Sequence, residues 1–370
     1  MNYKETLFFV AKCLTITLEE KNRIEIEDSL KNTEIDWDSF VKVSTQHFVF
    51  PALYCNLKRV NLLQYLPEEL VNYMIHITDL NRERNKQIIK QAKEINSLLL
   101  ANDITPIFLK GTGNLLEGLY ADIAERMVGD IDFIVSKNDY INTIKLIKGF
   151  GYNRVSKESY DFPQFKHYAR LHKEKRIAAI EIHKELLIEK YASEFNYDSV
   201  KKNLLKINEI TVLSYDDQIS LSIIAKQIND DGIYFKDIAL RNAYDVFLLS
   251  KKTKAKEAFK NFKNLKNPLN SFLASTYITF NKVSSLEYEN TVETEKYLQV
   301  FNNQISNRVN TKRVHKNIGF YLFVKNRLNI ILKSIVNKEF RKWVFNRIRD
   351  KNWQKEKLRQ LNITKSKSNS

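Results

Sequence analysis

The chain has 370 residues, with 60 lysines and arginines against 44 aspartates and glutamates, which gives a formal charge of +16. Apolar residues make up 43% and aromatic residues 12%, enough to form hydrophobic cores, and this excludes wholesale disorder. The 2 cysteines cannot staple a chain of this length and form no paired-cysteine zinc motif, so a reducing compartment is expected.

The excess positive charge lies at the C-terminal end. Residues 308–370 carry 18 basic and three acidic side chains, a net +15, whereas the other 307 residues are close to neutral at +1. No window approaches the ~20 uninterrupted apolar residues of a membrane span, and the N-terminus has no signal-peptide pattern. We therefore expect a cytoplasmic protein, peripheral at the inner membrane if the basic segment binds lipid.

Residues 1–102 are predicted to form an N-terminal helical region. Apolar residues recur there at helical spacing, as in Leu7, Val10 and Leu14 and again from Ile88 to Leu99.

Residues 103–190 have the pattern of an α/β core. Six of the eight glycines fall between Gly111 and Gly151, which indicates sharp turns or close backbone approach. The apolar patterns predict these elements in chain order: a strand at 104–109, a helix at 112–120, a buried strand at 131–135, a helix at 138–148, and a hairpin that pairs 166–171 with 177–183.

Residues 191–305 are predicted to be helical again. Ser214 is expected to cap a helix that carries Ile219 and Ile223, and another helix is expected over 241–249. Residues 281–312 are polar and weakly patterned, which predicts a linker or an exposed segment. Residues 306–370 form a basic amphipathic segment whose last residues, 364–370, are expected to be disordered. The predicted fold class is α+β, a small mixed sheet flanked by helical regions.

Two carboxylates in phase on the second predicted strand carry the functional argument. Asp130 and Asp132 are two residues apart, so they share one face of the strand. Neighbouring carboxylates repel each other and favour a bound cation, and hard oxygen ligands suit Mg²⁺. Glu181, on the predicted hairpin, is expected to supply a third carboxylate. The three acids predict a catalytic site with two Mg²⁺ ions, for which Mn²⁺ is an alternative.

The glycine-rich segment between the two strands is the candidate nucleotide-binding element. Gly111, Thr112 and Gly113 would let backbone N–H groups approach phosphates at the start of a helix. Lys110 and Arg126 would neutralise the charge that builds up on those phosphates. Taken singly, these residues are equally well explained as surface charges or turn residues; their order along the chain favours the site.

Three histidines, His167, His172 and His183, lie on the predicted hairpin. A zinc site is one interpretation, although the spacing is irregular and cysteines are missing from the hairpin. His183 shares a strand face with Glu181, so it is expected either to orient that carboxylate or to pack in the core. Asp245 is interpreted as a structural helix residue.

At this point the sequence resembles a bacterial nucleotidyltransferase family with a Lys-Gly signature, within the polymerase-β-like superfamily. The resemblance is specific over residues 105–185 and weaker upstream and downstream. It is carried by these motifs: Lys110-Gly111, Leu119-Tyr120, Arg126, Gly129-Asp130-Ile131-Asp132, Gly151-Tyr152 and Glu181-Ile182-His183.

The resemblance implies Mg²⁺-dependent transfer of a nucleoside monophosphate from an NTP to an acceptor, with Asp130, Asp132 and Glu181 as metal ligands. The acceptor is expected to be a small sugar-like or lipid-linked molecule, by analogy with related nucleotidyltransferases that resemble components of surface-polysaccharide gene clusters. Two departures stand out: the turn has Thr112 where the superfamily usually has serine or glycine, and Ala225-Lys226-Gln227 replaces a frequent histidine pair.

Two other functions fit the sequence. One is a non-catalytic or regulatory nucleotide-binding protein that docks on RNA or membrane through its basic helix. The other is an enzyme that modifies a protein partner with AMP.

The basic segment itself has three interpretations. Apolar residues recur at helical spacing over 318–348, with basic residues between them. This pattern fits an anionic membrane surface, nucleic-acid phosphates, or a helix packed on the protein's own core with a solvated basic face.

Overall fold

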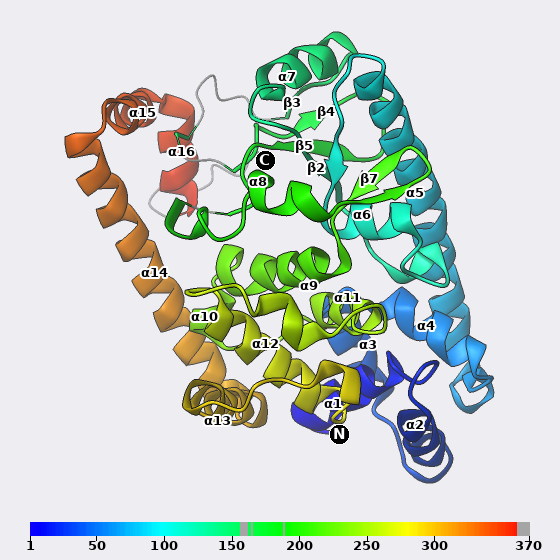
Figure 1. Ribbon diagram of the computed structural model, residues 1–370. Coiled ribbons are helices and arrows are strands. Elements are labelled where there is room, and N and C mark those ends of the chain that lie inside the picture. The colour runs from blue at the N-terminus through cyan, green and yellow to red at the C-terminus, as the bar shows by residue number, and fades with distance from the viewer. Residues whose placement is uncertain (156–161, 164–165, 188, 361–370) are drawn as a thin grey trace, which may run out of the picture. The chain divides into compact units, whose positions relative to one another are not determined.

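The computed structural model describes residues 1–155, 162–163, 166–187 and 189–360 (Figure 1). The chain divides into two units, one of residues 1–155 and 166–312 and the other of residues 156–165 and 313–370. Helices and one mixed sheet confirm the predicted α+β class. The predicted disorder of residues 364–370 lies outside the described residues.

The N-terminal region is helical, as predicted. Asn2 and Asp36 cap its first and third helices with side-chain oxygens, which satisfies N–H groups that have no partner inside a helix. The fifth helix buries Ile88, Ala92 and Ile95 at helical spacing. The elements are α1 (Tyr3–Cys13), α2 (Glu20–Asn32), α3 (Trp37–Gln46), α4 (Phe50–Arg59), the 3₁₀ turn η1 (Leu63–Tyr65) and α5 (Glu68–Leu100).

A seven-stranded sheet follows, with the order β3-β4-β5-β2-β1-β7-β6 (Figure 1). The central strands β2 and β5 are parallel, β1 is antiparallel to β2, and β7 is parallel to β1. The strands are β1 (Ile107–Phe108), β2 (Asp130–Ile134), β3 (Asn153–Arg154), β4 (Leu171–His172), β5 (Ala179–His183), β6 (Leu205–Ile207) and β7 (Ile210–Val212). The strand predicted at 104–109 is thus only two residues long.

Helices connect these strands. The first connection, between β1 and β2, contains α6 (Lys110–Glu117) and the 3₁₀ turn η2 (Ile123–Glu125). The second, between β2 and β3, contains α7 (Tyr140–Gly149). Ile131 and Phe133 are completely buried, because β2 has neighbouring strands on both sides and its apolar side chains face the core. The helix predicted at 112–120 is α6, which begins two residues earlier and ends three residues before the predicted end.

Most of the region after the core is helical, but the prediction of a helical region over 191–305 is wrong at β6 and β7, which form a hairpin and join the sheet through the parallel pairing of β7 with β1. Each of these strands is only three residues long, too short for an alternating pattern to show in the sequence. Ser214 accepts a hydrogen bond from the Asp217 N–H at the start of α9, which confirms the predicted cap. The elements are η3 (Glu189–Tyr191), α8 (Tyr197–Val200), η4 (Lys201–Asn203), α9 (Tyr215–Ile224), the π-helical turn η5 (Ala225–Asn229), α10 (Gly232–Phe235), α11 (Leu240–Leu249), η6 (Ala255–Phe259), α12 (Lys266–Thr279) and η7 (Ser284–Leu286).

The prediction of a linker or exposed segment over 281–312 is wrong. This stretch contains α13 (Val292–Ser306), whose Tyr297, Phe301 and Ile305 are buried. These residues are spaced four apart and form one stripe, but the many polar residues between them obscure it in the sequence.

Glu117, at the end of α6, is partly buried and faces Gln218 of α9. Gln218 Nε2 donates to its Oε2 at 2.6 Å, while Oε1 has no hydrogen-bond partner among the described residues. Burial raises the pKa of Glu117 to about 7. Between pH 4.5 and about 7 the Glu117 carboxyl group is therefore protonated in the folded state but ionised in the unfolded chain. The free energy of unfolding falls as the pH rises through this interval.

We expect Glu117→Gln to be more stable than the wild type by about 1–2 kcal/mol near pH 8 and equal to it near pH 4.5, because an amide carries no charge to bury. Denaturant unfolding at the two pH values measures this difference. Glu209→Gln, at an exposed position, is the control and should show no such pH dependence. A constant difference between Glu117→Gln and the wild type would contradict the assignment.

The C-terminal segment forms α14 (Arg308–Val336), α15 (Lys338–Arg349) and α16 (Lys351–Gln360). The helical stripe predicted over 318–348 is therefore divided at Asn337, whose side chain caps α15 by accepting from the N–H groups of Glu339 and Phe340. Phe162 packs edge-on against Phe340 and Trp343 within this unit. Among the described residues, every helix is too short or too polar to cross a bilayer.

Candidate metal and nucleotide site

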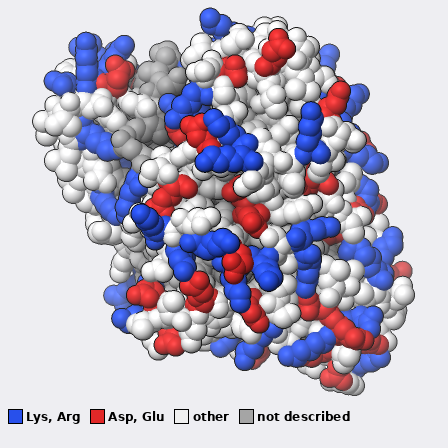
Figure 2. All heavy atoms as spheres, in the orientation of Figure 1, with Lys and Arg blue, Asp and Glu red and all other residues white. Residues whose placement is uncertain are grey.

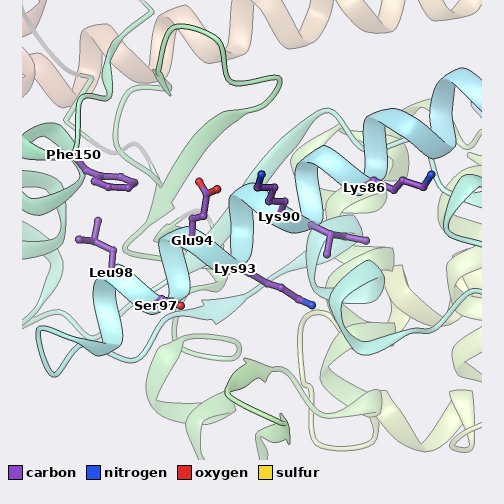
Figure 3. Close-up of a pocket in the computed structure, with 8 residues that line it drawn as sticks. Lys86, Lys90, Lys93, Glu94, Ser97, Leu98 and Phe150 are labelled. Carbon is purple, nitrogen blue, oxygen red and sulfur yellow. The ribbon is translucent and has the colours of Figure 1, made fainter.

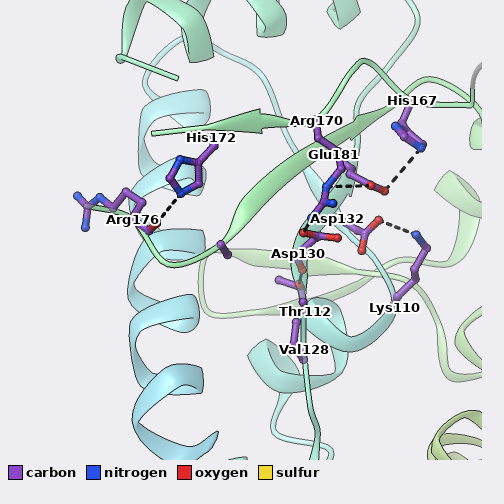
Figure 4. A network of polar contacts seen from close by, with 12 residues as sticks. Lys110, Thr112, Val128, Asp130, Asp132, His167, Arg170, His172, Arg176 and Glu181 are labelled. Carbon is purple, nitrogen blue, oxygen red and sulfur yellow. Dashed lines mark hydrogen bonds and ion pairs between the residues drawn. The ribbon is translucent and has the colours of Figure 1, made fainter. Parts of the chain in front are cut away.

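Two of the predicted carboxylates lie side by side on the central strands. Asp132 of β2 is directly paired with Glu181 of β5 in the parallel register, so both side chains leave the same face of the sheet (Figure 4). The pairing exists only because β5 lies next to β2, a contact between residues 49 positions apart in the sequence. The sheet therefore brings Asp132 and Glu181 together, as the sequence predicted.

Asp132 is the centre of the polar network. Lys110 Nζ donates to its Oδ1 at 2.6 Å, and His183 Nε2 donates to the same oxygen at 2.8 Å. Burial alone would raise the pKa of Asp132, but these two donors lower it well below its usual range. Asp132 is therefore ionised at any physiological pH.

His183 is a neutral member of the same cluster. Burial lowers its pKa to about 4, so the ring is uncharged near pH 7. Since Nε2 carries the proton donated to Asp132, Nδ1 is unprotonated. This nitrogen is buried, and no group in the described part of the chain donates a hydrogen bond to it. The sequence argument treated this histidine as a group that orients Glu181 or packs in the core, whereas the structure places it on Asp132.

The geometry of this cluster fits a metal ion. One ligand atom each from Asp132, Glu181 and His183 lie within 4.8 Å of one another. Burial and the charge of Asp132 raise the pKa of Glu181 to about 7, a repulsion that a bound cation would relieve. Carboxylate oxygens suit Mg²⁺ and Mn²⁺, and the imidazole nitrogen adds to the preference for a transition metal such as Mn²⁺.

Asp130 lies beside this cluster and is held by an arginine. Its carboxylate pairs with the Arg170 guanidinium, whose Nε also lies 3.7 Å from Glu181 Oε1 (Figure 4). Arg170 thus links Asp130 to Glu181. The structure brings two of the three predicted carboxylates together with a histidine, and the third is joined to them through an arginine.

The predicted nucleotide-binding segment is the first turn of α6. Lys110 begins the helix with a φ of +52°, a left-handed conformation that costs about 1 kcal/mol or more in a non-glycine residue. From this position Lys110 Nζ donates to Asp132. Backbone strain of this kind is concentrated at functional sites in proteins.

The residues after Lys110 pack α6 tightly onto the sheet. A Cβ at Gly113 would lie 2.8 Å from the Phe108 carbonyl oxygen, and one at Gly111 would lie 3.0 Å from a Val128 methyl group. Thr112 is buried and its hydroxyl donates to the Asp130 carbonyl at 2.8 Å. In this structure Gly113 and Thr112 therefore fix the helix against β1 and β2.

Arg126 is buried in an ion pair. Its guanidinium donates to both carboxylate oxygens of Asp245 at 2.9 to 3.1 Å, and Tyr120 Oη donates to the same carboxylate at 2.7 Å. Asp245 is thus a structural residue of α11, as interpreted from the sequence. The Arg126 guanidinium also lies beside Gly111, within 3.6 Å of the position of a Cβ there, so it supports the first turn of α6.

Sequence reasoning missed Lys166. Its carbonyl accepts from the N–H of Lys184 at 2.8 Å, which places it beside the end of β5. Burial, followed by the charge of Lys110, lowers the pKa of Lys166 to about 8, although the nearby charges of Glu181 and Asp132 act to raise it. Among the described residues, its ammonium group has no carboxylate partner within ion-pair distance. Only the tertiary structure reveals this residue, because Lys166 has no distinguishing sequence context.

The other two histidines differ in position. The backbone of His167 forms an isolated antiparallel β-bridge with that of His183. Its Nε2 lies 3.7 Å from Glu181 Oε2, at the edge of the cluster. His172 donates instead to the Arg176 carbonyl at 2.8 Å (Figure 4). A zinc site formed by the three histidines would require them to converge on one point, and they do not.

A separate hollow of about 660 Å³ lies on α5 and the end of α7 (Figure 3). Its polar groups include Lys86, Lys90 and Lys93, and its Glu94 carboxylate is paired with Arg176 at 2.5 Å. The hollow is lined by none of the residues predicted for the site.

Comparison with known proteins identifies a family for this chain. A family model described as "Uncharacterised nucleotidyltransferase" matches residues 33–281, which include all the groups of the cluster. A comparison with curated proteins finds no match. A similarity to the crystal structure of JHP933 from Helicobacter pylori has 16% sequence identity and a TM-score of 0.29, over 65% of this chain and 96% of that one. Because the family model spans more than half of the chain, this protein belongs to the family of uncharacterised nucleotidyltransferases.

Proposed function

We propose that this protein transfers a nucleoside monophosphate from an NTP to the hydroxyl group of a small sugar-like or lipid-linked acceptor, with Mg²⁺ or Mn²⁺ as cofactor. The acceptor oxygen forms a bond to the α-phosphorus of the NTP, the bond from that phosphorus to the bridging oxygen breaks, and pyrophosphate leaves. The hydroxyl proton passes to a base or to solvent.

One observation carries this proposal. Asp132 and Glu181 are paired across neighbouring parallel strands, next to the first turn of α6 and its lysine. An acidic pair beside basic groups is the arrangement that binding a metal–triphosphate complex requires, because the acids hold the cations and the basic groups hold the phosphates.

Asp132 and Glu181 would hold the metal, and His183 would join them once its proton moves from Nε2 to Nδ1. Asp130 would join them if Arg170 released it. When bound, the metal would neutralise charge on the phosphates and polarise the α-phosphorus. In this proposal Lys110 turns from Asp132 to the phosphates, which would give the Lys110-Gly111 signature its function. Gly111 and Thr112 would offer their backbone N–H groups to the phosphates, because these groups have no acceptor within the helix, whereas the Gly113 N–H already donates to the Leu109 carbonyl at 3.1 Å.

Arg126 would affect nucleotide binding indirectly, by positioning the first turn of α6. Since its guanidinium is paired with Asp245, donates to the Met127 carbonyl and lies beside Gly111, we assign it the role of holding the first turn of α6 in place. This role replaces direct contact with phosphate.

Labelled NTP tests the proposal. We expect the purified chain to transfer label from α-³²P-NTP to a component of a sugar or lipid extract, with release of pyrophosphate, and EDTA to abolish transfer. Glu181→Gln should lower the rate roughly 100-fold or more, since it removes a charged ligand. Glu174→Gln, exposed in the turn before β5, is the matched control. Metal-independent transfer, or equal rates for the two variants, would refute the proposal.

Lys166 should contribute to binding of the triphosphate. We expect Lys166→Met to raise the KM for NTP by roughly 10-fold with a smaller effect on kcat, because one charge-assisted contact is worth about 1.5 kcal/mol. Steady-state kinetics at several salt concentrations measure this effect. Lys206→Met, exposed on β6, should leave the KM unchanged. An unchanged KM in Lys166→Met would show that this lysine is a spectator.

A further inference from the structure

The second unit presents an exposed apolar helix face. Seven residues of α14 share it, and between 37% and 70% of each is exposed to solvent: Phe320, Tyr321, Val324, Leu328, Ile331, Leu332 and Ile335. At about 100° per residue, these positions fall within an arc of about 120° on the helix. We call this surface the α14 apolar face.

Exposure of such a face to water is unfavourable in free energy. Apolar residues scattered singly over a surface need no explanation, but a continuous helical stripe of them marks an interaction site. The family model ends at residue 281, so the α14 apolar face lies outside the matched nucleotidyltransferase region. The face therefore calls for a partner separate from the nucleotide site.

Basic residues border the face on both edges. Lys325 and Arg327 lie on the helix just outside the two ends of the apolar arc. Arg327 lies over the Phe323 ring at 3.4 Å from its centroid, and Lys325 lies near the Tyr321 ring at 5.8 Å. Long basic side chains at the border of an apolar stripe can keep their stems in an apolar layer and their charges at its surface.

The next helix continues the basic character. α15 contains Lys338, Arg341, Lys342, Arg347 and Arg349 against the single acid Glu339. In Figure 2 the surface of the second unit shows lysine and arginine side chains among uncharged ones, with few acids. The partner must therefore be both anionic and apolar.

We infer that the α14 apolar face docks on an anionic lipid bilayer. The aliphatic residues would enter the boundary between headgroups and acyl chains, while the bordering lysines and arginines pair with anionic headgroups. RNA fits less well, because Leu328, Ile331 and Leu332 offer neither charge nor ring stacking to a nucleotide. A second copy fits less well because two segments of +15 repel each other.

Vesicle sedimentation of the full chain tests this inference. We expect binding to phosphatidylcholine vesicles that contain about 30% phosphatidylglycerol, and at least 10-fold weaker binding to pure phosphatidylcholine. Leu328→Ser with Leu332→Ser should weaken binding to the anionic vesicles at least 10-fold. The matched control is Ile24→Ser with Ile141→Ser, two exposed isoleucines of α2 and α7, which should bind like the wild type.

Three results would overturn the inference. The first is equal sedimentation of the Leu328→Ser, Leu332→Ser variant and its control with anionic vesicles. The second is a wild-type dimer that this variant converts to a monomer, which would assign the face to a second copy. The third is RNA binding that this variant abolishes while neither protein binds vesicles. Circular dichroism verifies that the variants remain folded, as expected for exposed positions.

Discussion

Asp132→Asn should abolish most of the metal-dependent activity, with a loss of roughly 100- to 1,000-fold in kcat. Asp132 is the buried carboxylate on which Lys110 and His183 both converge. Asparagine keeps the shape and one acceptor oxygen, but it removes the charge that a cation needs. The rate of NTP consumption, and titration of Mn²⁺ binding by calorimetry, both measure this loss.

Asp38→Asn provides the control for this change, because Asp38 is an exposed residue of α3. It should retain full activity and Mn²⁺ binding. In the Asp132→Asn protein, Lys110 keeps a hydrogen-bond acceptor but loses its counter-charge, so the fold could be destabilised. A thermal unfolding curve therefore distinguishes loss of the site from loss of the fold. Unchanged Mn²⁺ affinity in a folded Asp132→Asn protein would show that the metal binds elsewhere.

Breaking the Arg126–Asp245 pair should produce the largest loss of stability. Both side chains are almost completely buried, so Arg126→Ala leaves an uncompensated carboxylate in the core beside Tyr120. We expect a cost of about 3–5 kcal/mol in the free energy of unfolding, measured by denaturant titration. Activity should fall as well, because the guanidinium supports the first turn of α6 at Gly111.

A double variant separates the pair from its members. Arg126→Met with Asp245→Leu removes both charges together, and its cost should be well below the sum of the two single changes. The exposed pair of Lys201 and Asp198, with Nζ and Oδ1 2.7 Å apart, is the comparison, and breaking it should change the stability far less than breaking the buried pair. Additive costs at Arg126 and Asp245 would contradict the assignment of a coupled buried pair.

The site was partly predictable because some of its features are local. Alternation along a strand places Asp130 and Asp132 on one face wherever that strand lies. The position of Lys110 and Gly111 between the end of a strand and the start of a helix is equally local. Lys166 could not be found in this way, because its character comes from burial beside Lys110 and the acids, and the sequence around it shows neither.

Errors at the level of the fold had the same origin. Residues 281–312 contain more polar than apolar side chains, so they resemble a linker until α13 is seen to bury Phe301 and Ile305. The basic segment was predicted as one stripe, but the Asn337 cap starts a new helix. A cap is recognisable in the sequence, whereas the partner that buries a helix face is not.

The sequence alone determined the α+β class, the helical N-terminal region, the acidic strand and the concentration of charge in residues 308–370, because composition and periodicity depend only on neighbouring residues. The tertiary structure decided which groups meet. Glu181 lies opposite Asp132 through the pairing of β2 with β5, and Arg126 reaches Asp245 across 119 positions of the chain. Such contacts arise from hydrogen bonding and packing between distant segments, whose free energy no local pattern records.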